Sequence, residues 1–395
     1  MKKTLLTICL VWMCFSLSAQ KIIDLSGKWS FSIDRQDNGE KEKWFSHTLN
    51  DFINLPGSMP EKLKGDEVTA KTQWTGSLYD SSYYYNPYME KYRKEGNIKF
   101  PFFLTPDKHY VGAAWYQKEV NIPADWKGER ILLFLERPLI ETPVRGNGQT
   151  TGVQNSLCVP HQYDITRYVR PGKCTITIRV DNRIKEINVG PDSHSITDQT
   201  QGNWNGIVGR ICLQTTPKTY FDDIQIYPEP EQKLARVKVV IKGTGTAKVK
   251  LSAESFNTDK KHIVPAIQQE IKLNKGVTET EMVLPMGNDM LLWDEFHPAL
   301  YKLKAEVTNG KKTEIKEIQF GMRRFEIKGK WFYVNGRKTQ LRGTVENCDF
   351  PLTGYAPMDV ESWERVFRSC RSYGLNHMRF HSFCPPEAAF IAADR

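Results

Sequence analysis

Short segments in which apolar and polar residues alternate recur along this 395-residue chain from about residue 22 to residue 320. The segment 29–33 reads Trp-Ser-Phe-Ser-Ile, and the segments 114–120 and 174–180 repeat the same period of two. A strand with this period buries one side and exposes the other, and the Gly, Pro and Asn residues between the segments favour turns. The pattern therefore predicts antiparallel β-sandwiches for most of the chain.

The predicted strands fall into two groups. Residues 20–217 contain the first group, with a tyrosine-rich insertion at 74–112, and we expect them to form one β-sandwich. Residues 218–321 contain the second group and have the length of an immunoglobulin-like sandwich. The last two strands of this group, within 302–318, are joined by Asn-Gly at 309–310, which is typical of a tight hairpin turn.

The pattern changes in the last part of the chain. Residues 339–345 are predicted to form a buried strand and residues 375–380 another short strand, and apolar residues recur with helical spacing over 360–373. A proline-initiated, alanine-rich helix is expected over 385–395. The order strand, helix, strand, helix predicts parallel βα units. A closed (β/α)₈ barrel needs roughly 250 residues, so residues 322–395 hold only two units, and we expect the sequence to be a fragment.

The first 19 residues have the order of a secretory signal peptide. Lys2 and Lys3 precede a largely apolar stretch at 5–17, and small residues follow at 18–20. The apolar stretch is too short to span a bilayer stably. We expect residues 1–19 to be removed and the protein to be exported to the periplasm or the extracellular space, with an apolar first strand as the alternative. No later stretch predicts a membrane-spanning helix.

The distribution of charge argues against nucleic-acid binding, and the spacing of the cysteines and histidines indicates no metal site. The formal net charge is +9, but the basic residues are spread along the chain instead of forming an arginine-rich tract, so we expect no binding to nucleic acid. The cysteines and histidines after residue 19 show neither a CxxC pair nor a metal-ligand spacing, so the sequence predicts no metal-binding residue and no cofactor and leaves a bound metal open. The sequence gives no indication of the oligomeric state.

Three stretches of the chain together match one known family. They are the LWDEFHPALY segment at 292–301, the segments 320–325, 335–336 and 341–343, and the segments 374–379 and 392–394. On these stretches the chain resembles glycoside hydrolase family 2, which includes β-galactosidases and β-glucuronidases. The resemblance extends over nearly all of residues 22–395. It implies a sugar-binding jelly-roll sandwich at 20–217, an immunoglobulin-like sandwich at 218–321 and the start of a catalytic TIM barrel at 322–395.

The resemblance also implies a reaction. Enzymes of this family cleave terminal β-glycosidic bonds of oligosaccharides and polysaccharides with retention, using one glutamate as acid and base and another as nucleophile. In the family these glutamates follow the fourth and seventh barrel strands, which lie beyond residue 395. No catalytic residue is therefore assigned, and we expect this fragment alone not to hydrolyse glycosides. The alternative is a non-catalytic carbohydrate-binding protein built from two β-sandwiches.

Four residues are candidates for substrate binding. Arg379 lies in the second predicted barrel strand and His381 at its carboxyl end, where TIM barrels build their sites; a structural ion pair is the alternative for Arg379. Glu346 ends the first barrel strand and is expected to bond either a substrate hydroxyl or a neighbouring strand. Asp198 lies in a segment similar to the one that inserts an acidic residue into β-galactosidase sites, with a turn or cap role as the alternative.

The chain departs from the family pattern at both strand ends. Many members have Arg-x-x-His-Tyr-Pro after the second barrel strand, whereas residues 379–386 read Arg-Phe-His-Ser-Phe-Cys-Pro-Pro, with the histidine one place earlier. Residues 345–348 read Val-Glu-Asn-Cys where many members have Asn-x-His. These differences indicate a divergent subgroup, so the sugar is not predicted. Trp204 and the tyrosines of 74–112 fit either stacking on a glycan or ordinary packing.

Overall fold

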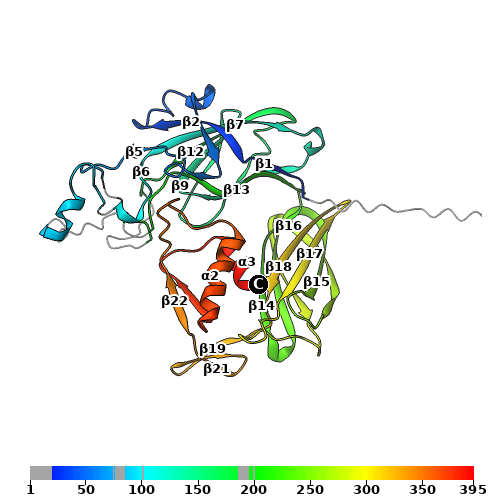
Figure 1. Ribbon diagram of the computed structural model, residues 1–395. Coiled ribbons are helices and arrows are strands. Elements are labelled where there is room, and N and C mark those ends of the chain that lie inside the picture. The colour runs from blue at the N-terminus through cyan, green and yellow to red at the C-terminus, as the bar shows by residue number, and fades with distance from the viewer. Residues whose placement is uncertain (1–19, 74, 76–84, 100–101, 186–194, 199–200) are drawn as a thin grey trace, which may run out of the picture.

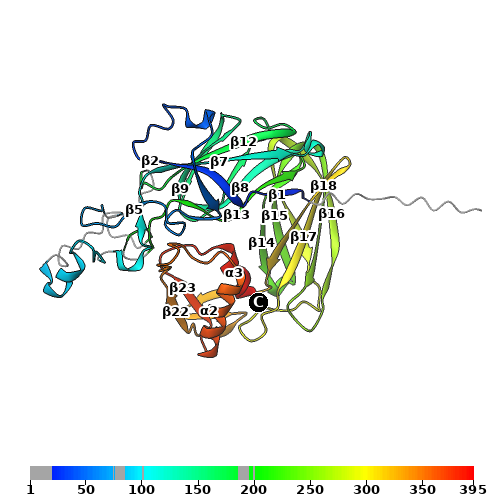
Figure 2. The same cartoon turned by 45° about the horizontal axis from the view of Figure 1, so that its top comes forward.

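The computed structural model describes residues 20–73, 75, 85–99, 102–185, 195–198 and 201–395. The expected signal peptide and part of the tyrosine-rich insertion lie outside these residues. Two β-rich bodies and a smaller segment with helices form the molecule (Figure 1). In that view the first body is at the top, the second at the right, and the helical segment lies below the first and beside the second. The turned view of Figure 2 shows the same neighbours.

The first body is a sandwich of two antiparallel sheets. The six-stranded sheet has the order β10 (Gln149–Ser156), β9 (Ile140–Gly146), β12 (Gly172–Asp181), β7 (Ala113–Ile122), β2 (Gly27–Asp34), β3 (Asp51–Leu55). The facing sheet has the order β1 (Ile22–Asp24), β13 (Gly206–Thr216), β8 (Arg130–Pro138), β11 (His161–Asp164), with β4 (Gly57–Ser58) paired to β13. β5 (Asp66–Glu67) and β6 (Lys108–His109) form a separate two-stranded antiparallel sheet.

The predicted alternation explains the core of this sandwich. Trp29 and Phe31 are completely buried, whereas Ser30 and Ser32 between them are only half-buried. The ring of Phe31 lies 5.2 Å from that of Tyr116 on β7, centroid to centroid. Side chains of both sheets form one apolar cluster, so the two faces of the sandwich share a single core.

The second body is built on two long strands. β15 (Leu234–Ser255) and β16 (Ile263–Pro285) pair along their length, and the register shifts between Gly243 and Gly245. β14 (Tyr220–Glu229) pairs with the first half of β15, whereas β17 (Tyr301–Asn309) pairs with the second half and with β18 (Lys312–Phe320). The strands thus fold over one apolar core, to which each of them contributes.

A small antiparallel sheet leads out of the second body. It consists of β19 (Phe325–Lys328), β20 (Trp331–Val334) and β21 (Arg337–Thr339). The prediction of a single strand over 339–345 is wrong, because β21 ends at Thr339 and β22 (Gly343–Glu346) begins after a break. Arg342 at this break donates its amide hydrogen to Asn376 Oδ1 and accepts from the Asn376 amide. These bonds hold the starts of two neighbouring strands together.

The last segment has the predicted order of parallel βα units. β22 pairs in parallel with β23 (His377–Phe380), and α2 (Val360–Ser372) makes the connection between them. Asp359 caps α2 by accepting from the Ser362 amide at 2.8 Å. Trp363 packs α2 onto the sheet, with its ring 5.7 Å from that of Phe380. α3 (Glu387–Asp394) packs beside α2 through Ala388, Ala389 and Ala392, which are buried.

Among the described residues, no helix is both long and apolar enough to cross a membrane.

Candidate functional site

The carboxyl ends of β22 and β23 lie against a loop of the first sandwich. This β12–β13 loop comprises residues 182–205, of which 182–185, 195–198 and 201–205 are described. Gln201 donates from Nε2 to the carbonyl oxygens of Asn347 at 2.8 Å and His381 at 2.5 Å. Ser195 Oγ donates to the Ser382 carbonyl oxygen at 3.1 Å. The sandwich therefore contacts both parallel strands at the end where βα enzymes place their sites.

Three asparagines close the base of the β12–β13 loop. Asn182 Nδ2 donates to Asn203 Oδ1 at 2.9 Å, and Asn203 Nδ2 donates back to the Asn182 carbonyl oxygen at 3.0 Å. Asn205, which is fully buried, donates to the carbonyl oxygens of Gly112 and Val180, each at 2.9 Å. These hydrogen bonds join the two ends of the loop to each other and to the sandwich, so they fix the position of both ends.

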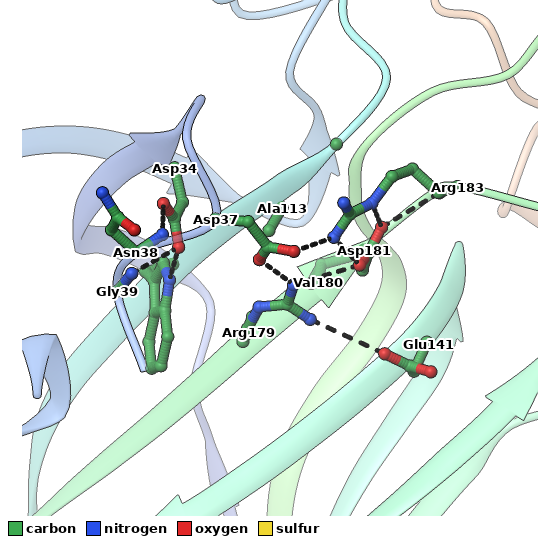
Figure 3. Close-up of polar contacts among 12 residues, drawn as sticks. Asp34, Asp37, Asn38, Gly39, Ala113, Glu141, Arg179, Val180, Asp181 and Arg183 are labelled. Carbon is green, nitrogen blue, oxygen red and sulfur yellow. Dashed lines mark hydrogen bonds and ion pairs between the residues drawn. The ribbon is translucent and has the colours of Figure 1, made fainter. Parts of the chain in front are cut away.

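An ionic network anchors the strand that enters the loop. Arg179 contacts Asp37, Glu141 and Asp181 at 2.5, 3.6 and 3.1 Å, and Arg183 bridges Asp37 and Asp181 (Figure 3). Asp181 is completely buried. Burial alone would raise the pKa of Asp181, but hydrogen bonds from Arg183 and Lys185 outweigh it and hold the pKa well below its usual range. Asp181 is therefore a charged structural residue at neutral pH.

Asp198 lies within the loop and is 2% exposed. Its Oδ2 accepts from the Thr75 amide at 2.5 Å, and its Oδ1 lies 3.3 Å from His109 Nε2. These contacts connect the loop to strand β6 and to the insertion that follows β5. Each oxygen of Asp198 thus has a partner within the protein, and the role of Asp198 as a substrate ligand stays a prediction.

Glu346 is the last residue of β22, and Cys348 and Asp349 follow it in the chain. The Glu346 carbonyl oxygen accepts from the His381 amide, and its Oε1 accepts from the Cys348 amide, both at 2.9 Å. Asp349 has a buried Oδ1 without a hydrogen-bond partner among the described residues. Burial and the nearby Glu346 carboxylate raise the pKa of Asp349 to about 6. The sequence interpretation named Glu346 but missed Asp349, although its place after a predicted strand was a usable signal.

Arg379 and His381 lie on and beyond the end of β23. Arg379 is exposed, and its side chain makes no hydrogen bond or ion pair with the described part of the chain. It is paired in register with the exposed Val345. Because strand side chains alternate, both face away from Phe380 and from α2. His381 Nδ1 lies 3.2 Å from Asn347 Oδ1.

The structure places three of the four predicted residues on two neighbouring strands or directly after them. Glu346 is the register partner of Phe380, so its side chain is on the face of the sheet opposite to that of Arg379. Asp198 is enclosed by contacts with Thr75 and His109. Gln201 and Asn347 were not singled out from the sequence, because only the folded chain places the loop beside the strand ends. Trp204 is 5% exposed, and its ring packs against that of Tyr355 at 5.6 Å between centroids. Of the two alternatives for Trp204, stacking on a glycan or ordinary packing, the structure shows packing.

A pocket of about 790 Å³ lies between the first sandwich and the segment after β22. Its walls combine strands β8 and β13 with residues 349–359. The residues with polar groups at this pocket include Glu136, Arg210, Asp349 and Tyr355. In the part of the chain that the structure describes, no three His, Cys, Asp or Glu side chains come close enough to hold a metal ion.

Comparison with known families identifies this architecture. Residues 22–217 match the model of the sugar binding domain of glycosyl hydrolases family 2, and residues 219–323 match the model named glycosyl hydrolases family 2. A sugar-binding sandwich, a second sandwich and parallel βα units define a multidomain protein of the glycoside hydrolase class. The chain belongs to glycosyl hydrolases family 2. The resemblance stated from its motifs is therefore confirmed.

Curated relatives of the chain are glycosidases. It is 24% identical over 313 residues to the β-galactosidase of Thermoanaerobacter pseudethanolicus, covering 75% of this chain and 39% of the relative. It is 23% identical over 396 residues to the β-glucuronidase of Paenibacillus borealis, covering 95% of this chain and 57% of the relative. The chain thus spans between about two fifths and three fifths of the length of these two relatives.

Solved structures show the same fold. A glycosyl hydrolase family 2 member from Bacteroides cellulosilyticus has a TM-score of 0.69 at 20% identity, with 95% of this chain and 44% of that chain covered. A β-glucuronidase from Ruminococcus gnavus has a TM-score of 0.69 at 18% identity, with coverage of 95% and 59%. Likenesses at this level of identity establish the fold alone.

Proposed function

We propose that the chain is the N-terminal part of an exported glycoside hydrolase that cleaves terminal β-glycosidic bonds of oligosaccharides or polysaccharides. The observation that carries the proposal is the contact of a sugar-binding sandwich with the carboxyl ends of two parallel strands. Barrels of βα units build their active sites at that end. The first sandwich then forms a wall of the site, and the parallel strands form its floor.

The proposed reaction is retaining hydrolysis by two glutamates. One protonates the leaving oxygen while the other attacks the anomeric carbon, with the two carboxyl groups about 5 Å apart. We place both glutamates on later barrel strands of a longer chain. Arg379 would bond neighbouring hydroxyls or a carboxylate of the sugar, because its guanidinium is exposed and offers several planar donors. Glu346 and His381 would bond hydroxyls from the two strand ends.

The decisive experiment uses the coding sequence beyond codon 395. We expect the longer product to release nitrophenol from one β-glycoside of a panel, and a barrel glutamate changed to glutamine to abolish release. We expect the 395-residue chain to release none. A stop codon directly after codon 395, together with glycan binding and no turnover, would instead support a carbohydrate-binding protein. N-terminal sequencing of the exported product, expected to start near residue 20, tests the localisation.

A further inference from the structure

One side chain of the first sandwich contacts both parallel strands. Gln201 uses the two protons of Nε2 on two carbonyl oxygens, those of Asn347 after β22 and His381 after β23. The same strand ends are joined to each other by the bond from the His381 amide to the Glu346 carbonyl oxygen at 2.9 Å. Gln201 therefore completes a closed set of bonds around the carboxyl ends of both strands.

The chemistry of the position favours glutamine. Two carbonyl acceptors require a nitrogen that carries two protons, and Gln201 is 7% exposed, so a lysine there would bury an unpaired charge. The orientation of the amide is fixed, because the reverse orientation would point Oε1 at two carbonyl oxygens. Oε1 itself is buried and has no hydrogen-bond partner among the described residues.

The β12–β13 loop holds Gln201 at a defined place. The Thr197 amide donates to the Gln201 carbonyl oxygen at 3.0 Å, which closes the turn that contains Asp198. Asp198 in turn accepts from the Thr75 amide, and Asn203 bonds Asn182 at the base of the loop. The backbone is therefore held by hydrogen bonds both before and after Gln201, and these bonds fix the position from which its side chain extends.

We propose that Gln201 is a positioning residue that fixes the carboxyl ends of β22 and β23 relative to each other and to the sandwich. This inference rests on the proposed function in so far as these ends form the floor of a glycosidase site. Gln201 acts through Asn347, His381 and the neighbouring Glu346, whose backbones it orders. The geometry of the site then depends on a residue that belongs to the sugar-binding sandwich.

Two substitutions of similar size separate this role from general loss of folding. Gln201→Met removes both donors, and we expect kcat/KM of the longer enzyme to fall about tenfold or more, as for a small misplacement of substrate-binding groups. Gln201→Glu carries no donor when ionised, but its protonated form regains one. We therefore expect its kcat/KM relative to the wild type to recover several-fold as the pH falls from 7.5 to 5, and Gln201→Met to show no such recovery. Equal kcat/KM for all three proteins would overturn the proposal.

Hydrogen exchange on the 395-residue chain tests the same role without activity. We expect the amides of Cys348 and His381 to exchange about tenfold faster in Gln201→Met, because the bonds that hold them open more often. The matched control is Gln269→Met, at an exposed position on β16, which should leave both amides unchanged. Unchanged exchange in Gln201→Met overturns the proposal even in an active enzyme. If the longer chain cleaves no glycoside, the proposed function fails, whereas the exchange result still decides the role of Gln201.

Discussion

His161 shows how a single enclosed residue makes the stability of the first sandwich depend on pH. Its ring is 1% exposed, and Nδ1 lies 2.5 Å from Thr142 Oγ1. Burial lowers the pKa of His161 from 6.5 to about 4. The unfolded chain therefore binds a proton near pH 6.5 that the folded chain binds only near pH 4. The contribution of His161 to stability is present above pH 6.5 and is lost as the pH falls toward 4.

We expect this effect to be measurable as a difference between variants. The free energy of unfolding should fall by up to about 3 kcal/mol between pH 6.5 and pH 4 through His161 alone. Urea unfolding at several pH values should show a smaller fall in His161→Gln than in the wild type. The control is His47→Gln, a substitution of a histidine at an exposed position. An identical pH dependence in His161→Gln would contradict the assignment.

At the residue scale, the sequence pointed to part of the candidate site. Glu346, Arg379 and His381 could be named because they follow or end short predicted strands, and the ends of parallel strands meet at one edge. Gln201 gave no such signal, since its importance depends on a loop packing against strands far along the chain. The roles of all four predicted residues in binding sugar stay predictions.

At the element scale, the paired strands β13 and β4 approach each other closely at a glycine. Gly206 has a φ of +147°, and a Cβ there would lie 2.5 Å from the Gly57 carbonyl oxygen and 2.9 Å from Ser58 Cα. Backbone atoms cannot move aside as a flexible side chain can. The neighbouring Ser58 Oγ donates to the Thr353 carbonyl oxygen at 2.6 Å, so this contact also supports the segment after β22.

Gly206→Ala should therefore destabilise the chain by about 2 kcal/mol or more. The matched control is Gly276→Ala, because Gly276 also has a positive φ of +107° but no atom within 4 Å of an added Cβ. We expect that substitution to cost only about 1 kcal/mol of backbone strain. Chemical denaturation of both variants measures the difference, and equal destabilisation would show that the close approach of β4 does not matter.

The elements themselves were predicted with uneven success. Alternation identified strands such as β2 and β12, and apolar spacing identified α2 almost to its ends, because both signals are local. The predicted strand at 339–345 failed for a physical reason. Its β-branched residues are typical of a strand, but the chain leaves one sheet after Thr339 and enters another at Gly343. The bonds between Arg342 and Asn376 at this break join residues distant in the sequence.

At the scale of the whole molecule, the βα segment has a core of its own. Trp363 is buried among Phe367, Phe380 and the alanines of α3. We expect Trp363→Ala to cost about 3–5 kcal/mol, as for other buried large-to-small changes. Amides of residues 343–395 should then exchange faster, while those of the two sandwich cores stay protected.

Tyr373→Ala is the control for this prediction, since Tyr373 is a large residue at the end of α2 with 85% of its surface exposed. It should leave the exchange of the βα segment nearly unchanged. Faster exchange throughout the chain in Trp363→Ala would show instead that the three parts unfold as one unit.

The mostly β, multidomain architecture could be predicted because each sandwich is encoded by local alternation. How the parts pack together could not be predicted, since side chains such as Trp204 and Tyr355 lie in different parts of the sequence and contact each other only in the folded chain. The family resemblance supplied the order of the parts. Closure of a complete barrel stays a prediction, as does export.

The bonds of Gln201 have a consequence for how such proteins can be recombined. Its partners Asn347 and His381 follow it in the sequence by 146 and 180 residues, after the residues of the second sandwich. A crossover placed between the two sandwiches would inherit the amide from one parent and the two carbonyl-bearing turns from the other. Chimeras joined near residue 217 are therefore expected to be most active when the two parents match both at Gln201 and at the turns that contain Asn347 and His381. The part of the chain that must be exchanged together is then larger than one domain.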